Sequence, residues 1–331
     1  MGLRQSPKTR LAIIGAGDIA RAHIKAFRNL DNIEIVGICA PTERHSRSIA
    51  NEFQIEIVCK DIQTLWDLTH ANAVVVAVPI LATSDVCVNV FSHDWMSLVE
   101  KPVGYNLVQA EELSTLASAK NHECFVALNR RHYGSTHQLQ KLVEANDSIR
   151  VIRVNDQEDQ LHALDDGYPI AVVENWQFAN SIHLIDYFLQ FGRGKISRVT
   201  RKIEFRESRL SHVSAEIEFS SGDKGLYEAV WNSPARWSVQ VECDSVIGEL
   251  KPLEQARIIR SGQSAEDCPS DPQDKKFKPG FRRQAELFIE NIRGQVVNSE
   301  LPTLNDALAT MRLIDLIYGS PEATERTTNI E

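Results

Sequence analysis

The chain has 331 residues, a formal net charge of −9 and a sequence pI of about 5.6. Its 43% hydrophobic and 24% charged residues are ordinary for a globular protein, and the length allows two domains with separate cores. The acidic balance, without a basic stripe interleaved with aromatic residues, argues against nucleic acid or an anionic membrane as the main partner. No apolar run approaches membrane-spanning length and the first ten residues carry no signal-like apolar stretch, so we expect a cytoplasmic protein.

Residues 10–128 alternate between apolar runs and stretches with helical spacing. The expected strands are 10–14, 33–39, 55–59, 73–78, 97–100 and 124–128. The expected helices between them are 19–30, 46–53, 62–68, 83–91 and 107–120. This order predicts an α/β fold with a doubly wound parallel sheet and helices on both faces, and it places a first domain over residues 1–128.

The pattern changes after an expected helix at 134–145. Runs with period-two alternation follow at 149–154, 199–205, 213–219, 225–230 and 237–241, and two helices are expected at 282–292 and 305–318. We therefore predict an α+β domain over 129–331, built on a large open, mostly antiparallel sheet with one solvated face. The polar, proline-bearing residues 261–278 are expected to form a surface loop, and the last helix is a candidate for packing back on the first domain.

Six cysteines are scattered along the chain without any CxxC pair. This spacing predicts reduced thiols and indicates neither a disulfide framework nor a zinc site, so no metal is expected. The six are Cys39, Cys59, Cys87, Cys124, Cys243 and Cys268.

A glycine-rich turn directly follows the first expected strand. Residues 11–20 read LAIIGAGDIA, which contains Gly15-x-Gly17-x-x-Ala20. Gly15 suits a tight turn, Gly17 lets the backbone approach a phosphate without a Cβ in the way, and Ala20 allows the helix to pack closely on the strand. Because a strand precedes the turn and a helix follows it, we expect a Rossmann dinucleotide-binding domain and not an ordinary glycine turn.

The end of the second expected strand bears on the choice between NAD and NADP. An acidic side chain roughly 20 residues past the glycines normally binds the adenosine ribose of NAD. Ala40 occupies that place, and Pro41-Thr42-Glu43-Arg44 follow. Arg44 or Arg47 could pair with the 2′-phosphate of NADP, which is slightly favoured, whereas a shifted register would bring Glu43 to the ribose. Each arginine alone fits a solvated helix face at least as well.

The residues expected to contact the cofactor come from this turn and from the ends of the neighbouring strands. They are Gly15, Ala16, Gly17, Asp18, Ile19, Ala40, Thr42, Arg44, Val78, Pro79, Glu100 and Lys101.

The fifth expected strand runs into Lys101-Pro102. This places a lysine at the carboxyl edge of a parallel sheet, where ligands of such sheets bind. Pro102 restricts the residue before it or follows a cis bond, and either way it holds Lys101 in one orientation. Near a nicotinamide ring, such a lysine could exchange a proton with a substrate hydroxyl. Taken alone, a lysine in this position is more often a solvated loop residue.

Over essentially its whole length the chain resembles the Gfo/Idh/MocA oxidoreductases, typified by glucose-fructose oxidoreductase, inositol dehydrogenase and the rhizopine catabolism protein. The resemblance rests on the order of the glycine turn, Glu100-Lys101-Pro102 with Glu111-Glu112-Leu113, Asn129-Arg130-Arg131, His183-Leu184-Ile185-Asp186, and a last helix that runs into Tyr318-Gly319-Ser320. It implies a Rossmann domain and a substrate domain on an open sheet that often mediates homodimers or homotetramers. It also implies NAD- or NADP-dependent hydride exchange with sugars, cyclitols or nucleotide sugars.

The resemblance further implies that Lys101 and His183 act around the substrate carbonyl or alcohol. A neutral imidazole would accept the hydroxyl proton while the carbon-bound hydrogen leaves as hydride, and the lysine would stabilise the developing alkoxide. Asp186, three residues on and on the same helical face, would orient the imidazole or cap a backbone group. Without the resemblance, His183 in the apolar helix 178–191 fits a core histidine better.

The chain departs from the family at Ala179, where the family commonly has an aspartate one helical turn before the histidine. Asn180 shares that face and could hydrogen-bond a substrate hydroxyl, but an amide cannot take a proton. Glu174 or the Asp165-Asp166 pair could supply a carboxylate by another route. The side chains expected to bind substrate are Arg130, Arg131, Tyr168, Asn175, Trp176, Asn180 and Asp186.

Two of these expectations have structural alternatives. Arg130 or Arg131 could pair with a carboxylate or phosphate of the substrate, and at least one of them is expected to form a salt bridge between domains instead. Trp176 either stacks on a sugar face or anchors the start of its helix. For the whole chain, the two hypotheses are a nicotinamide-dependent enzyme, favoured by Lys101 and His183 together, and a regulatory dinucleotide or sugar sensor, favoured by Ala179.

Overall fold

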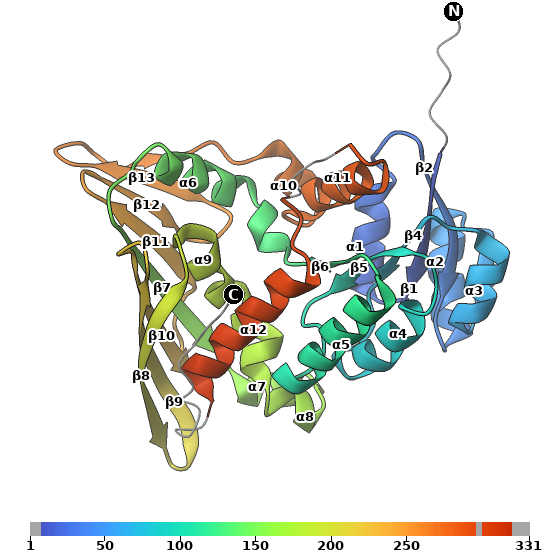
Figure 1. The fold of residues 1–331 in the computed structure, drawn as a ribbon, viewed down its shortest axis with the longest axis horizontal. Helices are drawn as coiled ribbons and strands as arrows, with labels where there is room; N and C mark the ends of the chain where they lie inside the picture. The colour runs from blue at the N-terminus through green and yellow to red at the C-terminus, as the bar shows by residue number, and fades with distance from the viewer. Residues whose placement is uncertain (1–7, 296–299, 320–331) are drawn as a thin grey trace, which may run out of the picture. The chain divides into compact units, whose positions relative to one another are not determined.

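The computed structural model describes residues 8–295 and 300–319. Within these residues the chain forms two compact units, drawn in Figure 1. The first comprises residues 8–104, 108–129, 276–295 and 300–308, and the second comprises 105–107, 130–275 and 309–319. Ser320, expected to follow the last helix, lies outside the described residues.

The first unit is built on a six-stranded sheet in which all neighbouring strands run parallel. The strand order is β3-β2-β1-β4-β5-β6, so it reverses between β1 and β4. Such a reversal is the point at which doubly wound sheets bind ligands. The strands are β1 (Thr9–Ile14), β2 (Ile33–Cys39), β3 (Ile57–Cys59), β4 (Ala73–Val76), β5 (Met96–Glu100) and β6 (Cys124–Ala127).

Helices follow each strand, as the alternating pattern predicts. Right-handed crossovers place α1 and α2 on one face of the sheet and the next three helices on the other. The central strands are buried on both sides, which explains their unbroken apolar runs; Leu11, Ala12 and Ile13 are fully buried. The helices are α1 (Asp18–Phe27), α2 (Glu43–Phe53), α3 (Ile62–Thr69), η1 (Ile80–Ala82), α4 (Thr83–Val90), α5 (Leu107–Lys120) and η2 (Asn129–His132).

A helix from the far end of the sequence completes the first unit. The helix α11 (Phe281–Ile292) lies beside α1 in Figure 1. The Phe281 ring lies 4.7 Å from the His23 ring, and Phe288 makes edge contacts with Phe27 and Phe125 at 6.1 Å. Because this apolar face is buried against the Rossmann core, residues 276–295 and 300–308 group with the first unit, whereas the expected second domain included them. The boundary between the units falls within α12 (Leu304–Tyr318).

The second unit contains an eight-stranded sheet with the order β14-β13-β12-β11-β7-β10-β9-β8. Only β7 and β10 pair in parallel and the other pairs are antiparallel, which confirms the predicted mostly antiparallel sheet. The strands are β7 (Arg150–Glu158), β8 (Ile196–Arg206), β9 (Arg209–Phe219), β10 (Lys224–Trp231), β11 (Ser238–Cys243), β12 (Val246–Leu250), β13 (Ala256–Arg260) and β14 (Glu266–Asp267).

One face of this sheet is covered and the other carries polar side chains. In β9, Val213, Ala215 and Ile217 are buried, whereas the alternate residues Glu216 and Glu218 are exposed. Several helices cover the buried face, among them α6 and α9 (Figure 1). The helices are α6 (Gly134–Glu144), α7 (Gln160–Asp165), α8 (Ile170–Val173), the π-helical turn η3 (Gln177–Ser181), α9 (Ile182–Phe191) and α10 (Pro272–Lys276).

The structure corrects two sequence predictions in the second unit. Residues 261–278, expected as a loop, contain β14, which pairs with β13, and the short helix α10. The helix expected to start at Phe178 begins as α9 only at Ile182, because the preceding five residues form a π-helical turn. Such turns change the helical spacing locally and are frequent at functional sites.

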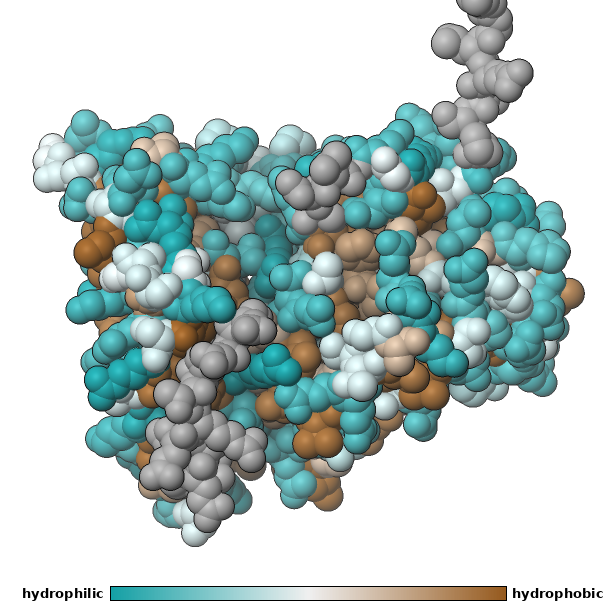
Figure 2. All heavy atoms as spheres, in the orientation of Figure 1, coloured by the Kyte–Doolittle hydropathy of each residue, from teal (hydrophilic) through white to brown (hydrophobic). Residues whose placement is uncertain are grey.

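The described residues contain no helix that is both long and apolar enough to cross a bilayer. Polar residues dominate the visible surface of both units in Figure 2, with apolar residues in smaller patches between them.

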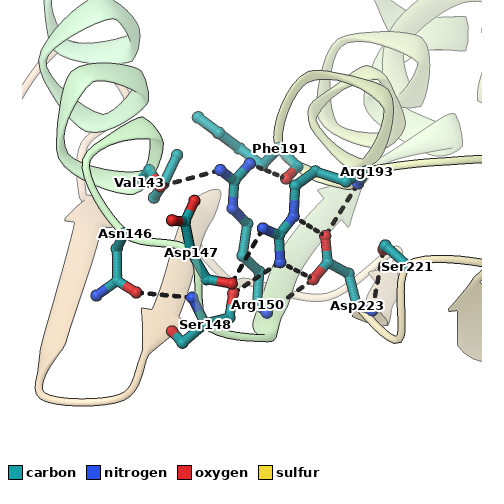
Figure 3. A network of polar contacts seen from close by, with 9 residues as sticks. All are labelled: Val143, Asn146, Asp147, Ser148, Arg150, Phe191, Arg193, Ser221 and Asp223. Atoms are coloured by element: carbon teal, nitrogen blue, oxygen red, sulfur yellow. Dashed lines mark hydrogen bonds and ion pairs between the residues drawn. The ribbon is translucent and has the colours of Figure 1, made fainter.

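A buried ionic network joins the sheet of the second unit to two helix ends (Figure 3). The Arg150 guanidinium donates to the carbonyl oxygens of Phe191 at 2.8 Å and Val143 at 2.9 Å, in the last turns of α9 and α6. The fully buried Asp223 accepts from Arg193 Nη2 at 2.7 Å and from the Arg150 backbone N–H at 2.9 Å. Burial alone would raise the pKa of Asp223, but the hydrogen bonds from Arg193 and from the backbone outweigh it and lower the pKa to about 2.

Asp223→Asn is expected to lower the free energy of unfolding at pH 7 by at least roughly 2 kcal/mol, the value that corresponds to the lowered pKa. Because the folded pKa lies below the unfolded one, the ionised carboxylate stabilises the fold fully above about pH 4 and loses this effect as the pH falls towards 2. Denaturant titrations of both proteins from pH 7 to pH 2.5 should therefore show a difference that narrows below about pH 4.

The matched control is Asp267→Asn, because Asp267 pairs with Arg257 at 2.7 Å on the surface. That change should cost less than about 1 kcal/mol. Equal decreases in the free energy of unfolding for the two variants would show that the Asp223 network stabilises the second unit no more than a surface ion pair does.

Candidate functional site

The glycine turn between β1 and α1 has the backbone that the sequence pattern predicts. Gly15 has a φ of +112°, and a Cβ there would lie 2.0 Å from the carbonyl oxygen of Ala77, just past β4. Only glycine satisfies both conditions, since L side chains rarely adopt this φ and the space is taken by backbone. The Gly15 N–H donates to the carbonyl oxygen of Cys39 at 2.8 Å, which ties the turn to the end of β2.

The N-terminus of α1 fits a pyrophosphate. Gly17 is its N-cap residue, no side chain within the described part of the chain caps it, and a Cβ on Gly17 would have no heavy atom within 4 Å. The start of α1, where the positive end of the helix dipole lies, therefore has open space beside Gly17. Ala20 is fully buried, as expected for the close helix–strand contact. Ala16 and Ile19 are half-buried and Asp18 is exposed.

Val78 and Pro79 follow β4 on the other side of the strand reversal from the glycine turn. Val78 is half-buried and Pro79 is exposed, and Ala77, next to them, forms the wall against which Gly15 fits. The predicted cofactor residues after β1 and β4 are thus brought together at the strand reversal of the sheet.

The segment after β2 presents cations around one carboxylate. Ala40 is buried and leaves no acidic side chain at the strand end, while Thr42 and Arg44 are exposed. Glu43 accepts from Arg47 Nε at 2.6 Å and from Lys60 Nζ at 2.9 Å. The hydrogen bond from Lys60 and, to a smaller extent, that from Arg47 lower the pKa of Glu43. Lys60, which follows β3, is a basic neighbour that the sequence prediction did not include.

The end of β5 carries the predicted Glu100-Lys101-Pro102 motif. The Lys101–Pro102 peptide bond is cis, one of the two arrangements expected from the sequence, and the Lys101 side chain is half-buried. Glu100 Oε1 lies 2.8 Å from Nε2 of the fully buried His23, on α1. This contact joins β5 to the helix that follows the glycine turn, which gives Glu100 a role inside the unit beside the predicted cofactor contact.

His183 lies near the start of α9 in the second unit and is 8% exposed. The residues before it form the π-helical turn, so Ala179 and Asn180 do not follow the α-helical spacing assumed from the sequence. Ala179 is buried and Asn180 is half-buried. The carboxylate candidates named from the sequence, Asp165, Asp166 and Glu174, are all exposed.

The structure supplies a carboxylate that the sequence prediction missed. Glu158, the last residue of β7, is 1% exposed and accepts from Trp176 Nε1 at 2.7 Å, Asn180 Nδ2 at 2.9 Å and Ser181 Oγ at 3.3 Å. Asn180 and Ser181 belong to the π-helical turn before His183 and Trp176 directly precedes that turn, so Glu158 holds the segment that leads into α9. Trp176 therefore anchors the start of this segment, one of its two predicted roles.

Glu158 belongs to a buried polar cluster on the covered face of the sheet. Its neighbour Asp156 is also 1% exposed and accepts from the Tyr227 hydroxyl at 2.7 Å, and Tyr227 in turn contacts the Tyr318 hydroxyl at 2.7 Å. Burial, together with the Asp156 carboxylate, raises the pKa of Glu158 well above its usual value. The sequence pattern could have identified these two carboxylates as buried, because Asp156 and Glu158 continue the buried period-two face of Ile152 and Val154.

Two predicted substrate residues, Arg131 and Asp186, pair with each other. Arg131 donates through Nε at 2.8 Å and Nη2 at 2.6 Å to the two carboxylate oxygens, a bidentate pair whose side chains are 12% and 6% exposed. Asp186 also accepts from the Thr310 hydroxyl at 2.8 Å. The salt bridge expected for one arginine thus forms inside the second unit, because both partners face its core, and these contacts favour a structural role for the pair.

The remaining predicted substrate residues of the second unit are half-buried or exposed. The half-buried Arg130 guanidinium stacks on the Trp237 ring at 4.2 Å. Tyr168 is 45% exposed and meets Trp176 edge to face at 5.0 Å, and Asn175 donates to the backbone carbonyl of Ala171 at 3.0 Å. Tyr168 and Trp176 therefore offer adjacent aromatic rings, a surface suited to the apolar faces of a sugar.

Residues 9–128, which carry the glycine turn and the Lys101 motif, match the family described as "Oxidoreductase family, NAD-binding Rossmann fold". They belong to the Gfo/Idh/MocA family. The family predicted from the motifs is thereby confirmed.

One curated relative and two solved structures extend the Gfo/Idh/MocA comparison. A 146-residue segment is 24% identical to glucose-6-phosphate 3-dehydrogenase of Bacillus subtilis (strain 168), and it covers 44% of this chain and 41% of that protein. The match thus spans less than half the length of this relative. A dehydrogenase from Chromobacterium violaceum superposes with a TM-score of 0.81 at 20% identity over 95% of each chain. The WlbA dehydrogenase from Bordetella pertussis, in complex with NADH and UDP-GlcNAcA, gives 0.75 at 15% identity over 96% of each chain. These likenesses establish the fold across nearly the whole chain.

Proposed function

We propose that this chain is a nicotinamide-dependent oxidoreductase that exchanges hydride with a hydroxyl or carbonyl group of a sugar, cyclitol or nucleotide sugar. The observation that carries the proposal is the uncapped α1 N-terminus with its open Gly17, in a unit whose strand β5 is followed directly by Lys101. The sugar dehydrogenase activity in the name of the curated relative and the ligands named with the Bordetella pertussis structure support the substrate class.

Three residues of this chain would have separate roles in the hydride exchange. Bound nicotinamide supplies a hydride acceptor or donor. His183, as a neutral imidazole, takes the proton of the substrate hydroxyl, and Lys101 stabilises the negative charge that develops on that oxygen. Glu158 holds the turn before His183 through Trp176, Asn180 and Ser181, which would limit the positions open to the imidazole.

A second candidate function is a sensor that binds dinucleotide or sugar without turnover. Ala179 favours it, because the family carboxylate is absent from that position. The buried Glu158 weakens this argument, because its carboxylate, at the end of β7, accepts from Asn180, the residue after Ala179.

We further propose NADP as the preferred cofactor. Arg44 is exposed after β2, and Glu43, the residue that would repel a 2′-phosphate, is neutralised by Arg47 and Lys60. NADPH should therefore bind roughly tenfold or more tightly than NADH, and Arg44→Ala should narrow that ratio while leaving NADH affinity unchanged. Titration of nicotinamide fluorescence measures the NADPH and NADH affinities of the wild type and of Arg44→Ala. Tighter binding of NADH than of NADPH by the wild type would overturn the preference.

The function itself is tested by challenging each dinucleotide complex with a panel of sugars, sugar phosphates, cyclitols and nucleotide sugars. A change in nicotinamide absorbance at 340 nm on any panel member would support the enzyme. Dinucleotide binding without a redox change across the panel would support the sensor. No dinucleotide binding would contradict both candidates. The oligomeric state remains a prediction.

A further inference from the structure

A cavity of about 670 Å³ lies in the first unit, along the outer face of α1. Five cationic side chains line it: Arg21, Lys25, Arg28, Lys276 and Lys278. The first three share one face of α1 by their spacing of four and three residues, and the two lysines come from the segment before α11. We call this cavity the basic groove.

The charge of the basic groove is opposite to that of the chain. Asp18 lines it at 3.3 Å from Arg21, and Glu52, next to the lining residue Phe53, accepts from Arg21 Nε at 2.7 Å. Arg21 is therefore neutralised by carboxylates. The chain as a whole has a formal net charge of −9. Lys25, Arg28 and Lys276 also line this concave site and together create a local positive potential, which attracts anions. Lys25 in the last turn of α1 also suits the helix dipole, but that effect does not account for the lysines at 276 and 278.

Two half-buried aromatic rings form the apolar part of the basic groove. The Arg28 guanidinium lies 5.9 Å from the centre of the Phe53 ring, and its Nη1 donates to the Phe53 carbonyl oxygen. The Lys276 ammonium lies 5.2 Å from the centre of the Phe277 ring. Cations held beside aromatic rings present a flat apolar surface next to donors for oxyanions.

The basic groove is not the dinucleotide site. Of the residues expected to contact the cofactor, Asp18 at the start of α1 lines it, whereas Gly15 and Gly17 do not. Its cations extend from α1 towards Phe53, at the end of α2, and towards residues 276–278. Its volume falls within the range of sites that hold a small organic molecule. Phosphate groups pair well with arginine and lysine, and a planar ring suits Phe53 and Phe277.

We propose that the basic groove binds a small organic polyanion with an aromatic ring, of the nucleoside polyphosphate type, at a site separate from the glycine turn. The proposal is independent of the nicotinamide reaction. Its anionic part contacts Lys25, Arg28 and Lys276, and its ring packs on Phe277.

The test uses the full-length chain and ATP as the probe, with binding measured by calorimetry. ATP should bind the wild type and should also bind Gly17→Asp, in which the dinucleotide site is blocked. The double variant Lys25→Glu/Lys276→Glu should bind ATP roughly tenfold or more weakly, because both lysines are exposed and the reversed charge repels phosphate. The matched control Lys195→Glu changes an exposed lysine of the second unit and should leave the affinity unchanged.

Two further arms identify what the basic groove recognises. Inorganic triphosphate should bind several-fold more weakly than ATP. Phe277→Ala should lower the affinity for ATP to that for triphosphate, because the ring contact is then lost. ATP binding that is lost in Gly17→Asp, or that is unchanged in the double variant, would overturn the proposal. So would binding of a poly-glutamate peptide under conditions in which ATP does not bind, since the partner would then be an acidic protein.

Discussion

Lys101→Ala is expected to lower turnover by about 10³-fold while dinucleotide affinity stays within a few fold. The reason is that Lys101 follows β5 at the carboxyl edge of the parallel sheet and would stabilise negative charge on the substrate oxygen, whereas the pyrophosphate is bound by the α1 N-terminus. Steady-state kinetics on a substrate found in the panel, together with a fluorescence titration of NADPH, measures the two effects separately.

Lys120→Ala is the matched control for this experiment. Lys120 is exposed at the last residue of α5 in the same unit, so its loss should change neither quantity. Turnover that is unchanged in Lys101→Ala would remove Lys101 from the mechanism. A parallel loss of dinucleotide affinity would instead assign Lys101 to cofactor binding.

Gly17→Asp should weaken dinucleotide binding by at least about 100-fold, or roughly 3 kcal/mol. Gly17 has a φ of −98° and open space where a Cβ would point, so a side chain fits the fold. Its carboxylate would occupy the position of the pyrophosphate and repel it, although the same carboxylate at the N-cap stabilises the free helix. The variant should therefore remain folded and lose only the ligand, as fluorescence titration and thermal unfolding would show.

Two variants at the same position separate charge from size. Gly17→Asn has nearly the size of the aspartate without its charge, and Gly17→Ala adds only a Cβ. We expect the affinity to fall in the order alanine, asparagine, aspartate, because the last adds electrostatic repulsion to steric exclusion. Undiminished binding by Gly17→Asp would show that the pyrophosphate does not lie at the glycine turn.

Much of the fold could be predicted because its signals are local. The β2 and α5 boundaries coincide with the predicted ranges, and the strand–helix alternation up to Ala127 leads to the observed parallel sheet. The short strands β12 and β13 escaped prediction, since five-residue runs such as VIGEL carry too few alternations to stand out. The position of α11 escaped as well, because a helix sequence does not say which surface its apolar face will cover.

The sequence by itself determined the glycine turn and the residues after it. Gly15 adopts a φ of +112°, and Gly17 has open space where a Cβ would point. Both features follow from the residue type at these two nearby positions. Tertiary structure alone decided the partners of the charged groups. Glu158 meets Asn180 from 22 residues away, and Asp186 meets Thr310 from 124. A buried carboxylate must find donors wherever the packing brings them, so its partners depend on the assembled sheet and helices and not on neighbouring residues.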